Sequence, residues 1–253
     1  MKPSPFRTTA KPTLLPIIAI LTGWLLIPAS LLADSYTDAY RIVRGARLYD
    51  NWGVLLQTKP PKENHPAYPK EGKAKGMDTW RCKECHGWDG KGKDGAYGKG
   101  KHATGIPGIL AWQGKDPAQV ATILRNPTHS YTPKQLSDGD IQDLALFVTR
   151  GQIDMATVID PETGKAKGDA NRGGPHFQTI CATCHGLTGQ ELNFGTPDKP
   201  EHLGAASREN PWEALFKIRF GQPKLKEDRM VALFSLPIDI LTDILAHTQT
   251  LPE

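Results

Sequence analysis

The pentapeptide Cys-x-x-Cys-His occurs twice in this chain of 253 residues and accounts for all of its cysteines. The copies are Cys82–His86 and Cys181–His185. The pattern is typical of c-type haem attachment, in which both thiols bond to the porphyrin and the adjacent histidine binds the iron. We therefore expect two covalently bound haems c (iron), with His86 and His185 as proximal iron ligands. The expected thioether cysteines are Cys82, Cys85, Cys181 and Cys184.

Other uses of paired cysteines are a structural zinc site, a disulfide or thioredoxin-like redox chemistry. A zinc site would combine two Cys-x-x-Cys pairs about 15–20 residues apart and would not need a histidine directly after each pair. Here 95 residues separate Cys85 from Cys181, and histidine follows both pairs. The spacing therefore favours haem over the three alternatives.

Residues 1–33 are predicted to lie outside the fold. Three basic residues precede an apolar stretch over residues 14–32, and residues 1–33 contain no acidic residue. Ala33 then suits a signal-peptidase cleavage site. Leu31, two residues before Ala33, is not small, and 19 apolar residues can just span a bilayer. Both a cleaved signal peptide and a retained N-terminal membrane anchor stay open. Either implies export, and the expected location is the periplasm.

Charge gives no indication of a nucleic-acid partner. Without residues 1–33, the 31 basic residues fall to 28 against 27 acidic ones. Haem propionates would make the mature protein neutral or mildly acidic. A strongly basic surface of the kind that binds nucleic acid is not predicted.

Helix signals recur in the same order before and after residue 158. In each half, a glycine and an aromatic residue come before the Cys-x-x-Cys-His motif, and a capped helix follows the motif. A loop comes next, and an apolar helix ends the half. No segment alternates as a strand does, so we predict an all-α fold with long loops. The residues that carry these signals are Gly45, Tyr49, Asp116, Pro117, Ser137 and Asp140 in the first half and Gly173, Gly174, Phe177, Asn210, Pro211, Glu213, Gly221 and Pro237 in the second.

This order resembles the class I cytochrome c fold. The resemblance implies two cytochrome c-like helical domains, each wrapped around one haem, over residues 34–158 and 159–253. The first departs from the pattern through an insertion at residues 51–80, which we interpret either as a solvated surface excursion or as a docking or inter-haem segment. Tandem two-haem cytochromes of this type carry electrons, although a minority are enzymes.

The sixth iron ligands are expected in the loop before each closing helix. His129 lies 43 residues after His86, and Met230 lies 45 residues after His185. We predict His129 as the distal ligand of the first haem and Met230 as that of the second, although Met230 could instead be a core residue. The remaining candidates are His102, Met77 and Met155 in the first half and His202 and His247 in the second.

These expectations lead to an exported electron-transfer protein. The histidine/methionine haem should have the higher reduction potential, so electrons are expected to enter at the first haem and leave at the second. The segment Lys59–Lys101 holds eleven basic against six acidic residues. We interpret it either as a docking surface for acidic redox protein partners beside the first motif or as a solvated lysine-rich loop. The alternative is an enzyme with one catalytic haem, acting on a small sulfur or nitrogen oxyanion or on peroxide.

Overall fold

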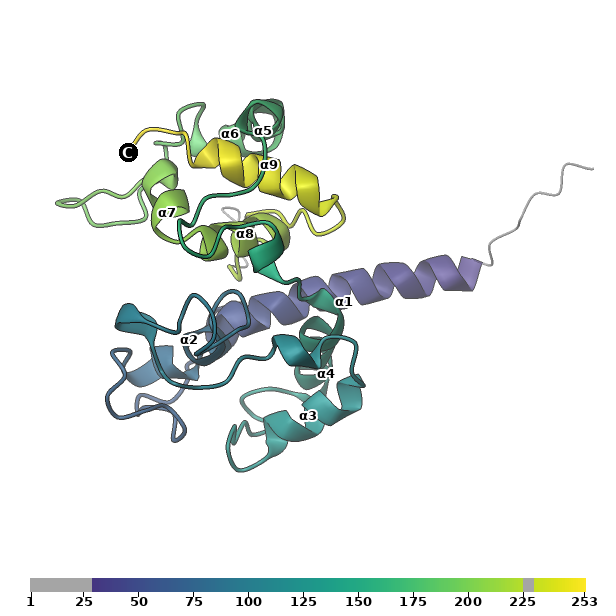
Figure 1. The fold of residues 1–253 in the computed structure, drawn as a ribbon. Helices are drawn as coiled ribbons and strands as arrows, with labels where there is room; N and C mark the ends of the chain where they lie inside the picture. The colour runs from purple at the N-terminus through teal and green to yellow at the C-terminus, as the bar shows by residue number, and fades with distance from the viewer. Residues whose placement is uncertain (1–28, 225–229) are drawn as a thin grey trace, which may run out of the picture.

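The computed structural model describes residues 29–224 and 230–253 (Figure 1). Within these residues the regular structure is helical, and the β pairings are isolated bridges. The prediction of an all-α fold is confirmed at this level. The α-helices are α1 (Ala29–Leu55), α2 (Cys82–His86), α3 (Pro117–Arg125), α4 (Asp138–Leu146), α5 (Ala170–His176), α6 (Ala182–His185), α7 (Leu203–Glu209), α8 (Pro211–Phe220) and α9 (Ile238–Thr248).

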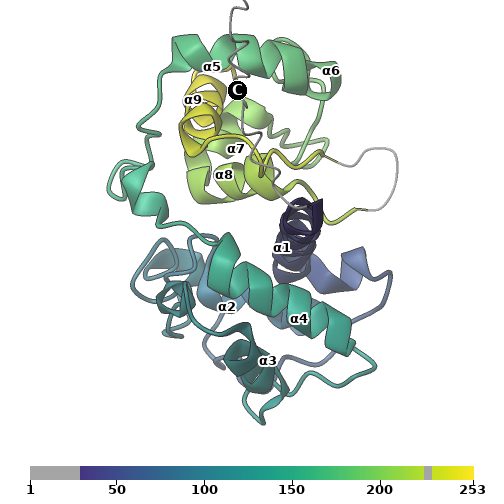
Figure 2. The same ribbon diagram turned by 90° about the vertical axis from the view of Figure 1, so that its right-hand side faces the viewer.

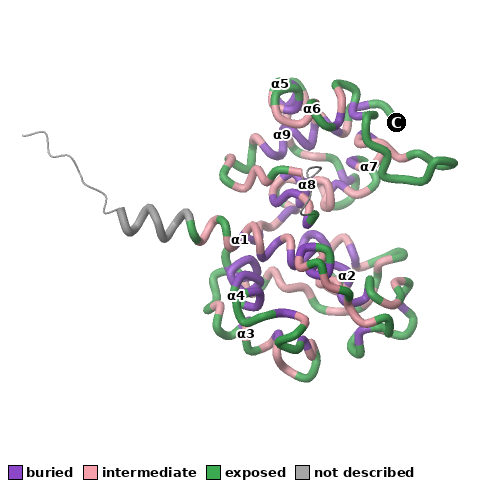
Figure 3. The backbone as a smooth tube through the Cα atoms, turned by 180° about the vertical axis from the view of Figure 1, so that it is seen from behind, coloured by how far each residue is buried: buried purple, intermediate pink, exposed green. Residues whose placement is uncertain are grey.

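The helices form two groups that lie one above the other in Figures 1 and 2. In the first group α4 packs against both α1 and α3, and α2 lies beside α1. In the second group α9 packs against α5, α7 and α8. Buried residues lie along the facing sides of these helices (Figure 3). The expected boundary between residues 158 and 159 falls in the segment that connects α4 to α5.

Local capping explains where the helices begin. Asp116 accepts a hydrogen bond from Ala118 N and precedes α3, whose first residue is proline. Ser137 and Asp140 form the predicted capping box at the start of α4. Asn210 caps α8 in the same way through Glu213 N. These side chains satisfy backbone N–H groups that the first helical turn leaves without partners, so the helix starts were readable from the sequence.

One helix crossing occurs twice. A Cβ atom on Gly45 would overlap the carbonyl of Asp143 and lie 2.9 Å from Phe147 Cβ. A Cβ atom on Gly173 would overlap the carbonyl of Asp243 and lie 3.0 Å from His247 Cβ. Glycine therefore lets α1 touch the backbone of α4, and lets α5 touch that of α9.

The rings beside the two crossings repeat as well. Tyr49 lies four residues after Gly45 and packs on Phe147 with ring centroids 5.2 Å apart. Phe177 lies four residues after Gly173 and packs on His247, also at 5.2 Å. The two halves thus share a tertiary arrangement as well as an order of motifs.

The beginning of α1 overlaps the predicted export segment. The helix begins at Ala29, ahead of the expected cleavage point at Ala33, and ends at Leu55 after a kink at Asn51. Most of the export segment, including residues 14–28, lies outside the described residues. Over the part of the chain that the structure describes, no helix combines the length and the apolar character needed to cross a membrane.

Helix α8 joins the two groups through an apolar contact. Phe216 and Phe220 are each 1% exposed. Phe216 packs on Trp88 with ring centroids 5.0 Å apart, and Phe220 packs on Phe147 at 5.5 Å. Burial of each phenylalanine contributes about 1.5–3 kcal/mol relative to exposure. The contact places α8 of the second group beside the first Cys-x-x-Cys-His motif.

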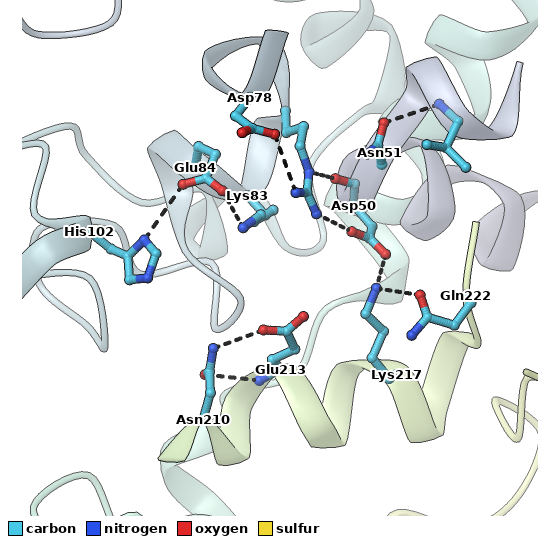
Figure 4. Close-up of polar contacts among 12 residues, drawn as sticks. Asp50, Asn51, Asp78, Lys83, Glu84, His102, Asn210, Glu213, Lys217 and Gln222 are labelled. Atoms are coloured by element: carbon cyan, nitrogen blue, oxygen red, sulfur yellow. Dashed lines mark hydrogen bonds and ion pairs between the residues drawn. The ribbon is translucent and has the colours of Figure 1, made fainter. Parts of the chain in front are cut away.

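A buried ionic network lies beside this contact (Figure 4). Asp50 is 1% exposed and pairs with Arg81, at 2.9 Å, and with Lys217 of α8. Lys217 also donates to Gln222 Oε1 at 3.1 Å. Burial lowers the pKa of Lys217, and Asp50 opposes that shift. Because Arg81 directly precedes Cys82, the network connects the first motif to the second group.

Candidate haem-attachment sites

Both pentapeptides fold as a short helix that ends at a glycine. Helix α2 contains the whole first motif, and Cys181 is the N-cap of α6, which contains the rest of the second motif. Residues three and four apart share one face of a helix, so each motif directs its two cysteines and its histidine to the same side. Gly87 and Gly186 follow at φ +76° and +74°, a conformation that favours glycine.

The turns after the two motifs are also alike. Gly92 N donates to His86 O at 2.9 Å, and Glu191 N donates to His185 O at 3.2 Å. Each bond spans six residues. A second glycine with positive φ stands four residues after each histidine, at Gly90 and Gly189. The repeated unit is therefore Cys-x-x-Cys-His-Gly-x-x-Gly, a longer signature that was visible in the sequence.

All four cysteines lie within the described residues, and all are free thiols. Burial raises the pKa of Cys82 to about 11, of Cys85 to about 12 and of Cys181 to about 11. Thiols of this kind stay protonated at neutral pH and are poor nucleophiles. The environment does not suit thioredoxin-like exchange, which needs a lowered thiol pKa.

His86 has the orientation that an iron ligand needs. Its Nδ1 donates to the carbonyl of Pro107 at 2.8 Å, which leaves the lone pair on Nε2. A hydrogen bond from the second ring nitrogen commonly orients a metal-binding histidine. Burial lowers the pKa of His86 to about 4, so the imidazole is neutral and able to bind a metal at pH 7.

His129 faces His86 across the first site. Their ring centroids are 6.3 Å apart, and the ring planes differ by 28°. With metal–nitrogen bonds of about 2 Å and about 1.1 Å from each nitrogen to its ring centre, one iron between two imidazoles requires ring centres about 6.2 Å apart. Burial lowers the pKa of His129, which keeps its ring neutral as well. Of the predicted ligand pairs, this is the one that the structure brings together.

The loop that carries His129 is held from both of its ends. The side chain of Asn126 accepts from His129 N at 3.1 Å. Arg125 donates to the carbonyls of Tyr131 and Leu136 at 3.0 and 2.8 Å. Tyr131 in turn donates to the carbonyl of Trp80 at 2.8 Å, which ties the loop to the segment preceding Cys82. These hydrogen bonds therefore restrain the loop around His129 to one conformation.

The other first-half candidates lie in different surroundings. His102 stacks on Tyr97 with centroids 4.6 Å apart and lies 3.6 Å from Glu84. Met77 is 48% exposed, and Met155 is buried in the core. None of the contacts described for these three side chains involves His86.

The second site is more open. His185 is buried and packs on Phe194 with ring centroids 6.1 Å apart. Its Nδ1 has no hydrogen-bond partner within the described chain. Leu187 and Phe194 are 71% and 45% exposed, and the loop over residues 190–200 is exposed throughout (Figure 3). An apolar group bound at His185 would cover part of this surface, so the residues present fit haem.

The second distal ligand stays a prediction. Met230 is half-buried against the core and is the first described residue after residues 225–229. Its backbone lies close to Gly221, at the end of α8, and no described contact joins it to His185. The alternatives have other partners, since His202 donates to the carbonyl of Leu192 and His247 packs on Phe177.

The basic segment around the first motif presents eight exposed lysines. Two further lysines of the segment are engaged within the protein: Lys83 is buried and pairs with Glu84, and Lys91 pairs with Asp154 at 2.6 Å. The expected docking surface is therefore narrower than the sequence suggested. The exposed lysines are Lys59, Lys62, Lys70, Lys73, Lys75, Lys93, Lys99 and Lys101.

Comparison of the chain with protein-family models, with curated proteins and with solved structures found no match. The two motifs and the geometry of the residues around them are therefore the features that bear on function.

Proposed function

We propose that this protein is an exported dihaem c-type cytochrome that transfers single electrons between periplasmic or membrane-bound redox partners. The observation that carries the proposal is the 6.3 Å separation of the His86 and His129 rings, beside Cys82 and Cys85. The repeated Cys-x-x-Cys-His-Gly-x-x-Gly unit supports a second haem at Cys181 and Cys184. Under this proposal each helical group is a class I cytochrome c-like domain.

The residues of the first site have distinct roles in this proposal. Cys82 and Cys85 hold the haem by thioether bonds, Pro107 orients His86, and the 126–137 loop presents His129. A bound haem supplies an iron that cycles between the ferric and ferrous states. The hydrogen bond to Pro107 holds the His86 ring, and backbone hydrogen bonds hold the loop that carries His129. Ligands fixed in this way would keep their positions in both states, which minimises rearrangement during electron transfer.

The second site is proposed to use His185 and Met230. A thioether ligand favours ferrous iron, so this haem would have the higher potential and would be the exit for electrons. The alternative function is a dihaem oxidoreductase that acts on a small oxyanion or on peroxide. It needs one iron whose sixth ligand can be exchanged for substrate. The exposed surroundings of His185 are the observation that favours it.

Haem content and spin state test the proposal. The full chain would be produced with a c-type haem maturation system, and covalent haem would be measured by mass and by the pyridine haemochrome spectrum. We expect two haems per chain and two distinct low-spin ferric signals in low-temperature EPR. Replacement of His129 by Ala should convert one signal to high spin, and replacement of Met230 by Ala the other.

Other results would redirect or end the proposal. A substantial high-spin signal in the unaltered protein would support the enzymatic alternative. Absence of covalent haem from protein made with an active maturation system would contradict both functions. The mass of the purified chain would also show whether residues 1–33 are removed or retained, and so whether the protein is released or anchored.

A further inference from the structure

His65, a buried side chain of the insertion at residues 51–80, lies against residues that adjoin the first proposed iron site. His65 is 6% exposed, although it lies in a segment rich in proline and lysine. Its ring lies 4.5 Å from the Trp80 ring, centroid to centroid, and 5.8 Å from the Tyr131 ring. Both of these residues adjoin the site, because Trp80 precedes Cys82 by two residues and Tyr131 follows His129 by two.

The hydrogen bonds of His65 determine its tautomer. Nδ1 accepts from Ala67 N at 3.1 Å, so the proton lies on Nε2. Nε2 then donates to the carbonyl of His129 at 2.8 Å. His65 N donates to Thr79 Oγ1 at 2.8 Å, which fixes the backbone at the same point. Both ring nitrogens of His65 therefore make hydrogen bonds, and Nε2 binds the backbone carbonyl of the proposed distal ligand, His129.

We propose that His65 is a positioning residue that keeps His129 on the first haem iron. This inference rests on the proposed function, since it assumes that His129 is the distal ligand. The other restraints come from nearby residues of the same loop: Asn126 accepts from His129 N, and Arg125 donates to the carbonyls of Tyr131 and Leu136. His65 holds the His129 carbonyl itself and does so from a segment 64 residues away in the chain. The insertion is thus a strap over the distal loop rather than a solvated excursion.

Ligand exchange at the ferric iron tests this role. Cyanide can bind a six-coordinate haem only after the distal ligand leaves, so its binding rate reports how often His129 detaches. The kinetic phase of the first iron is identified as the one that His129→Ala accelerates. In His65→Phe, which keeps a ring but loses the donor, we expect that phase to become about tenfold faster, the factor that loss of one hydrogen bond produces.

Two further variants separate positioning from packing. His65→Gln retains a terminal N–H donor and should restore a rate within about twofold of the unaltered protein. Asn64→Ala removes the neighbouring hydrogen bond from Gly76 N to the Asn64 side chain, at 2.7 Å, without touching His129, and should leave the rate unchanged. If His65→Phe yields no haem-loaded protein, His65→Asn replaces it, because its shorter amide does not reach the carbonyl.

The outcomes distinguish this inference from the proposed function. Loaded His65→Phe protein with an unchanged cyanide rate, whatever its thermal stability, would overturn the positioning role and leave the electron-transfer proposal intact. Equal acceleration in His65→Phe and His65→Gln would also overturn it. If His129→Ala leaves both spectrum and rates unaltered, the ligand assignment fails and the inference fails with it. Failure of the proposed function itself would show as absence of covalent haem.

Discussion

At the scale of single residues, Gly45 and Gly173 each allow two helices to approach closely. Each stands where two helices touch, and the space that a side chain would need is filled by the backbone of Asp143 or Asp243. Backbone atoms cannot rotate away as the end of a flexible side chain can. The only accommodation is for the helices to separate, which would loosen the rings packed beside each crossing.

We expect Gly45→Ala and Gly173→Ala each to lower the free energy of unfolding by about 2–3 kcal/mol, the upper part of the usual range for overpacking a close contact. Gly139→Ala is the matched control, because its Cβ would meet only Ser137 Oγ, at 3.8 Å. That control should be neutral or stabilising by up to about 1 kcal/mol. Guanidinium unfolding of haem-loaded protein measures all three, and equal stabilities for Gly45→Ala and Gly139→Ala would contradict the account.

At the scale of elements, ion pairs fasten the opening helix of each half to its closing helix. Asp143 on α4 accepts from Arg41 at 2.8 Å and from Arg44 at 2.7 Å, both on α1. Asp243 on α9 accepts from Arg172 Nε at 2.8 Å, on α5. The two aspartates occupy equivalent places in the repeated crossing. The ion pairs of each aspartate therefore fix the orientation of two helices that the glycine allows to approach closely.

The ion pair between Asp243 and Arg172 should make the free energy of unfolding depend on pH. The hydrogen bond from Arg172 lowers the pKa of Asp243 below 3.8, with burial opposing the shift. A carboxylate whose pKa is lowered by folding contributes stability above the unfolded value and loses it as the pH falls through the folded value. Asp243→Asn should therefore cost about 1–2 kcal/mol at pH 7, a figure reduced because Arg172 is largely exposed.

Below about pH 4 the difference between Asp243→Asn and the unaltered protein should shrink, because the native carboxylate is then becoming protonated. Urea unfolding between pH 7 and pH 2 would measure this. Asp239→Asn, an exposed site on the same helix, serves as the control for loss of one negative charge. A difference that stays constant down to pH 2 would show that Asp243 acts by shape alone.

At the scale of the whole molecule, the two halves are held together at α8. The apolar contact of Phe216 with Trp88 excludes water from the ionic network around Asp50, and Lys217 lies 5.0 Å from the Trp88 ring centroid. A buried charge that loses its partner is strongly destabilising. The interface therefore sets the relative position of the two motifs, and with it the distance between the proposed haems.

Lys217→Met should lower the free energy of unfolding by about 3 kcal/mol, because Asp50 would keep only Arg81 as a charged partner. It should also allow the two halves to unfold at separate temperatures in calorimetry. Lys224→Met removes an exposed lysine shortly after α8 and should have little effect. Indistinguishable calorimetric traces for the two variants would refute a coupling role for Lys217.

Several features could be predicted because they depend on residues close together in the chain. The caps at Asp116, Ser137 and Asn210 satisfy N–H groups two or three residues away, so sequence alone located three helix starts. The loop position of His129 was predicted from its distance to His86. The role of His65 was not predicted, because an isolated histidine between loop residues carries no periodic or motif signal.

The sequence by itself determined the helical class, the two Cys-x-x-Cys-His motifs and the order of elements, since each is encoded by neighbours within a turn or two of helix. Tertiary structure alone decided that the rings of His86 and His129 lie 6.3 Å apart, that His65 bonds to the His129 carbonyl, and that Asp50 and Lys217 join the halves. Such contacts link residues 43 to 167 positions apart. They depend on how whole helices pack, and helix packing is set by the summed burial of many side chains rather than by any local pattern.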